Sequence, residues 1–181
     1  LHGILHSFPT RRSSDLRTIE RVYLSPEKPQ ATPDAVKAIK EAQVIVLGPG
    51  SLYTSIIPNL LIGEIAEAIA ASDAVKVYVC NAMTQPGETD GYKASDHIKA
   101  ILAHSSLKVI DYCIVNTAEI PQEILKKYAK QGSYLVENDR RKIEDLGYRV
   151  IEDDFGVIED TLIRHDPLRL AKIILGLIEE I

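Results

Sequence analysis

Three short apolar runs, each followed by a polar or glycine-rich turn, set the pattern of this sequence. They are Val44–Leu47, Val75–Cys80 and Val109–Val115. Short apolar runs bounded by turn residues are typical of strands buried on both faces of a parallel sheet. The intervals between them carry helical spacing of apolar residues, so the order of elements predicts an α/β fold with a mostly parallel sheet.

The composition suits one globular domain of this class. The chain has 181 residues, 45% of them hydrophobic, and a net charge of −5, so no basic surface indicates nucleic-acid binding. No apolar segment approaches the ~18 residues typical of a membrane-spanning helix, and no signal peptide is evident. We therefore expect a cytoplasmic protein without membrane insertion. Cys80 and Cys113 fit neither a redox pair nor a zinc site and are predicted to be buried thiols.

The first run opens into the turn GPGS at residues 48–51. Gly48 and Gly50 lack a Cβ atom, so the backbone there can reach positive φ and approach an anion closely. Hydroxyl groups follow within a few residues, at Ser51, Tyr53, Thr54 and Ser55. A phosphate-binding cradle and an ordinary strand-to-helix turn explain this segment equally well, because short glycine motifs often occur without a ligand.

The polar residues that end the three runs are expected to meet. The runs lead into Gly48, Asn81 and Asn116, and in an open parallel sheet such ends lie along one edge, where ligands bind. An asparagine side chain both donates and accepts hydrogen bonds, so it suits a ribose, a sugar hydroxyl or the edge of a base. The alternative for each asparagine is an Asx turn that leads the chain out of the strand.

A long polar loop, residues 81–92, follows the second run. Loops at this edge of a sheet often carry function. Glu88 and Asp90 lie two positions apart in it and are predicted as a magnesium site completed by ligand phosphates, with solvated loop charges as the alternative. Further along, His97 is expected at the surface, with ligand contact as the alternative. His165 precedes the last predicted helix, from where it could reach a phosphate.

Residues 1–16 do not share the patterning of the rest of the chain. The segment has no helical or strand period, and residues 6–16, HSFPTRRSSDL, resemble the translation of a sequencing-adapter oligonucleotide. We therefore expect residues 1–16 to be non-native and residues 17–181 to form a single α/β domain. On this interpretation the chain is a fragment whose native N-terminal portion lies upstream.

Three longer stretches carry a resemblance to a known family. They are GPGSLYTSIIPNLL from residue 48, VYVCNAMTQPGETDGYKASDHI from residue 77 and IDYCIVN from residue 110. Together they closely resemble the YvcK-type gluconeogenesis factors, which are relatives of the CofD phospholactate transferases. The resemblance extends from about Arg17 to the carboxyl terminus.

This resemblance implies a Rossmann-like three-layer sandwich whose strand edge binds a nucleotide-type ligand. The family normally opens with a strand and a glycine-rich turn, so the sheet of this chain is expected to be incomplete, without its N-terminal βα portion. For the YvcK branch the resemblance implies binding of a UDP-sugar such as UDP-N-acetylglucosamine. It also implies a regulatory role in cell shape and cell-wall homeostasis during gluconeogenic growth, and a homodimer at full length.

The resemblance leaves two functions open. The wording of the motifs favours the YvcK branch, so we expect ligand binding without catalytic turnover. The alternative is a CofD-type transferase that moves a phospholactyl group from a nucleotide diphosphate conjugate to a deazaflavin, with magnesium held at Glu88 and Asp90. The residues expected to bind the ligand are Gly48, Pro49, Gly50, Ser51, Tyr53, Thr54, Asn81, Thr84, Gln85 and Asn116.

Overall fold

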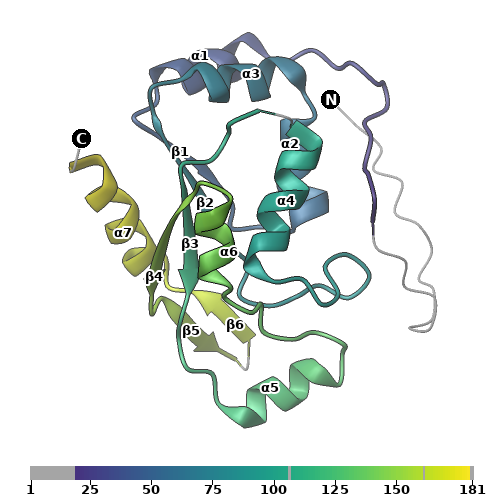
Figure 1. Cartoon of the computed structure of the whole chain (residues 1–181), viewed down its shortest axis with the longest axis vertical. Coiled ribbons are helices and arrows are strands. Elements are labelled where there is room, and N and C mark those ends of the chain that lie inside the picture. The colour runs from purple at the N-terminus through teal and green to yellow at the C-terminus, as the bar shows by residue number, and fades with distance from the viewer. Residues whose placement is uncertain (1–18, 106, 161, 180–181) are drawn as a thin grey trace.

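The computed structural model describes residues 19–105, 107–160 and 162–179 of the chain (Figure 1). The expectation for residues 1–16 therefore lies outside the described residues. A parallel sheet forms the centre, with strands in the order β1-β2-β3-β4, and the predicted parallel α/β fold is confirmed. The strands are β1 (Val44–Leu47), β2 (Val75–Val79), β3 (Tyr112–Asn116) and β4 (Arg149–Asp153).

Helices fill the connections between these strands. A π-helical turn, η1 (Leu52–Ile56), follows β1 and continues directly into α2. The α-helices are α1 (Pro33–Glu41), α2 (Ile57–Leu60), α3 (Gly63–Ala71), α4 (Ala94–Ser105), α5 (Gln122–Ala129), α6 (Arg140–Asp145) and α7 (Pro167–Glu179). No single helix in the described ranges is long and apolar enough to cross a membrane, and the one pair that reaches the required length together is bent by 77°.

The sheet carries helices on both faces, which confirms the predicted three-layer sandwich (Figure 1). Apolar residues of α2, α4 and α6 pack together with Tyr78 and Cys113 on one face. Right-handed crossovers between successive neighbouring strands place their helices on the same side, which explains this arrangement. On the other face, α7 contributes Leu170 and Leu177 to a cluster with Val77 of β2.

The core is centred on β2, whose five residues are all buried. Its side chains alternate between the two faces, so Tyr78 belongs to the cluster under α4 while Val77 and Val79 belong to the cluster under α7. Cys80 and Cys113 are buried free thiols, as predicted. The centre of the sheet is therefore fixed by packing, and its polar features lie at the ends of the strands.

Two local predictions were wrong. The third apolar run forms ladder pairs only from Tyr112 onward, although Ile110 before it is fully buried. His97 is 0% exposed rather than at the surface, because it lies on the face of α4 that packs against the sheet.

A hairpin that follows β4 was not predicted. β5 (Gly156–Glu159) and β6 (Leu162–His165) pair antiparallel beside the main sheet. The hairpin lies beyond the ends of β3 and β4 (Figure 1). It is joined to the strand ends by the hydrogen bond from the N–H of Phe155 to Oδ1 of Asn116, at 3.1 Å.

Candidate functional site

The ends of β1, β2 and β3 lie side by side, as the parallel register requires. Leu47 pairs with Tyr78, and Val79 pairs with Ile114. The residues that follow these strands therefore share one edge of the sheet, which we call the carboxyl edge. The sequence predicted this convergence, whereas the ligand-binding roles assigned to these residues stay predictions.

The turn after β1 is shaped by its two glycines. Gly48 has a φ of +98°, and a Cβ atom there would lie 3.1 Å from the carbonyl oxygen of Val79. A Cβ atom at Gly50 would lie 3.1 Å from Cβ of Ser55. Pro49, between them, follows a cis peptide bond. The backbone therefore approaches β2 and the next helix more closely than larger residues would allow.

The helical segment after this turn begins without a side-chain cap. η1 and α2 run continuously from Leu52 to Leu60, and Ser51 at the N-cap makes no side-chain capping hydrogen bond. The first N–H groups of a helix have no partner within the helix, and they attract anions. Thr54, in the first turn, is exposed. The start of this segment is thus suited to a phosphate group.

Tyr53 takes a different direction from its hydroxyl-bearing neighbours. It is 3% exposed, and its hydroxyl lies 2.7 Å from that of Tyr92. Its ring packs edge-on against His104 of α4, with centroids 5.9 Å apart. Burial raises the pKa of Tyr53. A cavity of about 290 Å³ lies beside these rings, and Lys99 and Asp96 also line it. The structure thus gives the Tyr53 hydroxyl a partner inside the protein.

The loop after β2 is held in place by two buried threonines. Thr89 is fully buried, and its Oγ1 accepts the N–H of Gln85 at 2.8 Å. Thr84 accepts the N–H of Tyr134 through its Oγ1 at 2.9 Å, and its carbonyl accepts the Ser133 hydroxyl at 2.6 Å. Thr84 is therefore an anchor of the loop, and the backbone from which Gln85 projects is fixed.

Gln85 connects this loop to the turn after β1. Its Nε2 donates to Oγ of Ser51 at 2.6 Å, across 34 positions in the sequence. Three side-chain oxygens of the same loop are buried and have no hydrogen-bond partner within the described part of the chain: Asn81 Oδ1, Gln85 Oε1 and Glu88 Oε2. Buried polar atoms are normally paired, so these oxygens mark the β2 side of the carboxyl edge as chemically unsatisfied.

The two predicted magnesium ligands have different environments. Burial raises the pKa of Glu88, whose Oε2 lacks a partner in the described structure. Asp90 is exposed, and its Oδ2 accepts the N–H of Gly87 at 2.6 Å. Among the described residues, no group of three or more His, Cys, Asp or Glu side chains could hold a metal ion. A magnesium ion at Glu88 and Asp90 would therefore need most of its ligands from phosphates, and this site stays a prediction.

Asn116, at the end of β3, is used by the fold itself. Its Oδ1 accepts the N–H groups of Ala118 at 3.2 Å and of Phe155 at 3.1 Å. A Cβ atom at Gly156 would lie 2.6 Å from Cβ of Ala118 and 2.7 Å from Nδ2 of Asn116. This is the local turn given above as the alternative to ligand contact, extended by a bond to the hairpin.

His165 lies opposite Gly156 in the hairpin and is a further polar residue near the carboxyl edge. Its ring stacks on Phe155 with centroids 5.0 Å apart, and its buried Nδ1 has no partner among the residues described. Burial lowers the pKa of His165. The last helix is capped by Asp166, whose Oδ1 accepts the N–H of Leu168 at 2.9 Å. The sequence pointed to His165 through its place before α7, but the hairpin that positions it was missed.

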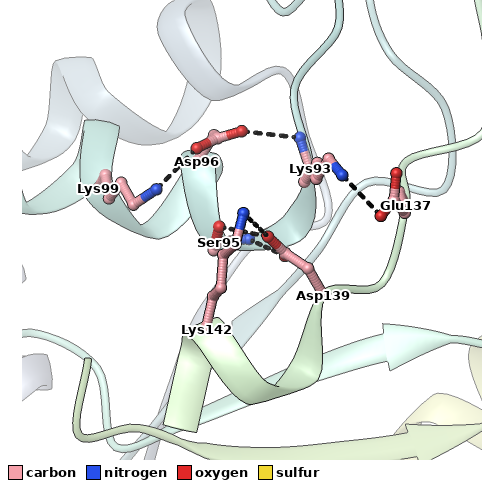
Figure 2. A network of polar contacts seen from close by, with 7 residues as sticks. All are labelled: Lys93, Ser95, Asp96, Lys99, Glu137, Asp139 and Lys142. Carbon is pink, nitrogen blue, oxygen red and sulfur yellow. Dashed lines mark hydrogen bonds and ion pairs between the residues drawn. The ribbon is translucent and has the colours of Figure 1, made fainter. Parts of the chain in front are cut away.

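A polar network fixes the start of α4 next to the loop (Figure 2). The carboxylate of Asp139 accepts both the N–H and the hydroxyl of Ser95, at 2.9 and 2.7 Å. Asp96 accepts the N–H of Lys93 at 3.1 Å, and the Lys93 ammonium pairs with Glu137 at 2.7 Å. The start of α4 is therefore held by a carboxylate from the segment that leads into α6.

The comparison that decides the family is a match to a family model. The model of 2-phospho-L-lactate transferase CofD matches residues 8–156, which is most of the chain. The chain belongs to the CofD family. Within the family it is similar to gluconeogenesis factors, so the resemblance drawn from its motifs is confirmed.

Relatives of this CofD-family chain are similar over nearly its whole length. A gluconeogenesis factor of Thermoanaerobacterium thermosulfurigenes is 47% identical over 94% of the chain, and the Bacillus subtilis gluconeogenesis factor is 43% identical over 90%. A crystal structure of a Bacillus halodurans protein has a TM-score of 0.86 and 44% identity over 88% of the chain. The chain spans about half the length of these relatives: 53%, 51% and 51%, respectively.

Proposed function

We propose that this chain supplies the β1 and β2 side of a nucleotide-sugar site in a gluconeogenesis factor. The ligand class is a UDP-sugar of the UDP-N-acetylglucosamine type, bound without turnover. The observation that carries the proposal is the pairing of an anion-accepting helix start after β1 with the unsatisfied polar loop after β2. A nucleotide-sugar offers both kinds of partner, because it joins phosphates to groups rich in hydroxyls.

The diphosphate would lie at the turn after β1. Gly48 and Gly50 let the backbone approach it, and the N–H groups from Leu52 onward carry the positive end of a helix dipole. Ser51 and Thr54 add hydroxyl donors at the same place. The net charge of −5 does not oppose such binding, because these contacts are made locally by backbone amides.

The sugar or ribose hydroxyls would lie toward the loop after β2. Asn81 Oδ1 is an acceptor without a partner in the described chain, and a hydroxyl group can donate to it. The oxygen is covered in this structure, so the Asn81 side chain would have to turn outward to meet the ligand.

Titration calorimetry of the complete protein with UDP-N-acetylglucosamine tests this function, because this chain would supply only one side of the site. We expect saturable heat, and we expect Ser51→Ala to weaken the affinity roughly three- to tenfold through the loss of one hydrogen bond to a phosphate. N-acetylglucosamine without the nucleotide is the matched ligand control and should give little heat. No heat with the nucleotide-sugar at millimolar concentration would overturn the proposal.

A role in cell shape and cell-wall homeostasis during gluconeogenic growth follows as part of the same proposal. It is supported by the similarity to gluconeogenesis factors. The test is complementation in a bacterium that lacks its own factor, grown on a gluconeogenic carbon source. We expect the complete gene to restore normal cell shape, and a version with Gly48→Val in the turn to fail at equal protein abundance.

A CofD-type transferase is the second candidate, favoured by the description of the matching family model. The half-buried Glu88, whose pKa is raised, is the side chain of this chain best suited to proton transfer. Magnesium, which this activity uses in relatives of the CofD type, would have to be held largely by the ligand's phosphates. If the complete protein transferred a phospholactyl group and Glu88→Gln abolished transfer without loss of nucleotide binding, this candidate would replace the first.

A further inference from the structure

The backbone of Gln85 is held by three hydrogen bonds within its own loop. Its N–H donates to Thr89 Oγ1 at 2.8 Å, and its carbonyl accepts the N–H groups of Thr89 at 2.9 Å and Glu88 at 3.0 Å. Thr89 itself is fully buried. These bonds close a tight turn over residues 85–89, so the direction in which Gln85 projects is set by the loop.

The bond between Gln85 and Ser51 has a defined polarity. The amide Nε2 donates and Ser51 Oγ accepts, at 2.6 Å. A serine hydroxyl has one hydrogen and two lone pairs, so accepting this bond leaves its hydrogen free to donate elsewhere. The hydroxyl is also drawn toward the loop, and Ser51 makes no capping bond to the helix that it precedes. The N–H groups at the start of η1 thus stay open.

We propose that Gln85 is a positioning residue for the phosphate site. It acts through Ser51, by fixing that hydroxyl as a donor toward an anion and by keeping it from capping the helix start. This inference rests on the proposed function, and it replaces the simpler expectation that Gln85 touches the ligand directly. The phosphate-binding surface therefore includes a residue from the neighbouring strand's loop that contributes no atom to the phosphate contact.

A double-mutant cycle in the complete protein tests the inference, with UDP and UDP-N-acetylglucosamine as probes. The variants are Ser51→Ala, Gln85→Met and the two combined. Each single change should weaken both ligands roughly three- to tenfold, because both ligands contain the diphosphate. In the Ser51→Ala background, Gln85→Met should change either affinity less than about twofold, because the group through which Gln85 acts is already gone.

Two further variants separate positioning from general damage. Gln43→Met makes the same chemical change at an exposed position just before β1, at the opposite edge of the sheet, and should leave both affinities unchanged. Gln85→Glu keeps the shape but accepts where glutamine donates, so it should weaken binding more than Gln85→Met. Thermal unfolding of each variant, where a midpoint close to that of the unmodified protein is expected, shows that the fold persists.

The outcomes distinguish the two proposals. If the unmodified protein binds neither ligand, the proposed function fails and the inference fails with it. If the protein binds but Gln85→Met costs the same in both backgrounds, Gln85 acts independently of Ser51 and only the inference is overturned. A Gln85→Glu variant that binds as well as the unmodified protein would also overturn the inference, since the donor role would then be dispensable.

Discussion

At the carboxyl edge, the ends of β2 and β3 both carry an asparagine, but the two side chains have different hydrogen-bond partners. Asn81 follows β2 and Asn116 ends β3, yet Asn116 Oδ1 accepts two backbone N–H groups whereas Asn81 Oδ1 accepts none in the described structure. The difference comes from the segments that fold back over each strand. The approach to the hairpin brings Phe155 to Asn116, while the loop after β2 folds upon its own threonines.

This comparison suggests a criterion for whether an asparagine at a strand end supports the fold or is available to a ligand. Where a later segment supplies backbone donors, the side chain completes the fold and a ligand has little to add. Where it does not, an acceptor stays unsatisfied at a free-energy cost of about 1–3 kcal/mol, which a ligand can recover. The proposed ligand is therefore expected to contact Asn81 after β2 rather than Asn116, whose side chain supports the fold.

His97 offers the largest test, because one of its two ring nitrogens is buried without a partner among the described residues, away from the carboxyl edge. Its Nδ1 lies 2.9 Å from the Tyr78 hydroxyl, and Nε2 is buried without a partner among described residues. Burial lowers the pKa of His97 from 6.5 to about 4. The unfolded chain thus binds a proton at higher pH than the folded chain, so stability falls as the pH falls from about 6.5 to about 4.

The loss over that interval should reach about 3 kcal/mol, and His97→Leu should remove it. Urea unfolding of both proteins from pH 7.5 to pH 4 measures the effect as the difference between two stability curves. The variant should be the less stable protein at pH 7.5, since Tyr78 loses a partner, and the gap should close in acid. Parallel curves would show that burial does not lower the pKa of His97. They would also weaken the use of unpartnered buried atoms to locate the ligand at the carboxyl edge.

Gly156→Ala tests the β3 side as a structural support. The added Cβ would meet Ala118 at 2.6 Å and Asn116 at 2.7 Å, so the hairpin connection must move. We expect a loss of about 2.5 kcal/mol in the free energy of unfolding. Gly176→Ala in α7 is the matched control, because nothing lies within 4 Å of its new Cβ and alanine favours a helix. Equal stability of the two variants would contradict the tight packing described for Asn116.

Much of this fold was predictable because it depends on local periodicity. The apolar runs predicted the positions of β1 and β2, and the helical spacing between the runs predicted that helices connect the strands. Convergence of the strand ends followed from parallel topology alone. The hairpin of β5 and β6 was missed because its segments are short and half exposed, so they carry little of the alternation by which strands are recognised.

The candidate site was less predictable, because it depends on contacts between distant positions. The sequence placed Ser51 and Gln85 in the site, but the bond between them joins positions 34 apart and leaves no local pattern. Tyr53 differs from Ser51 only through the helical turn between them, which directs its ring into the core. The sequence also did not distinguish Asn81 from Asn116. The difference depends on segments far along the chain, such as the one that brings Phe155 to Asn116.

Paired substitutions compare the two asparagines directly. Asn116→Ala removes the acceptor of two N–H groups and should cost about 1.5 kcal/mol of stability, whereas Asn116→Asp, which keeps Oδ1, should cost less. Asn81→Ala should not lower stability, because no bond to this oxygen is lost and the unsatisfied acceptor is removed. Chemical denaturation measures all three. A larger loss at Asn81 than at Asn116 would reverse the assignment of the two sides.

Glu88 gives the smallest effect, and its sign is opposite to that of His97. Burial raises the pKa of this carboxyl group, so the folded chain holds its proton to a higher pH than the unfolded chain does. The stability contributed by the protonated form is present below the unfolded value of 4.5 and is lost as the pH rises through the raised value. Glu88→Gln, which stays neutral, should therefore become the more stable protein toward pH 7.

Unfolding curves of Glu88→Gln and the unmodified chain between pH 4 and pH 7.5 measure this crossover, and Glu159→Gln, at an exposed position in β5, is the control. The same unfolding curves measured with bound ligand test whether Glu88 lies in the site. If the ligand brings donors to the β2 loop, it will stabilise the ionised carboxylate, and the pH dependence of the unmodified chain will shrink when UDP-N-acetylglucosamine is added. A pH dependence that the ligand leaves unchanged would place Glu88 outside the site and leave Asn81 as the side chain of the β2 loop proposed to contact the ligand.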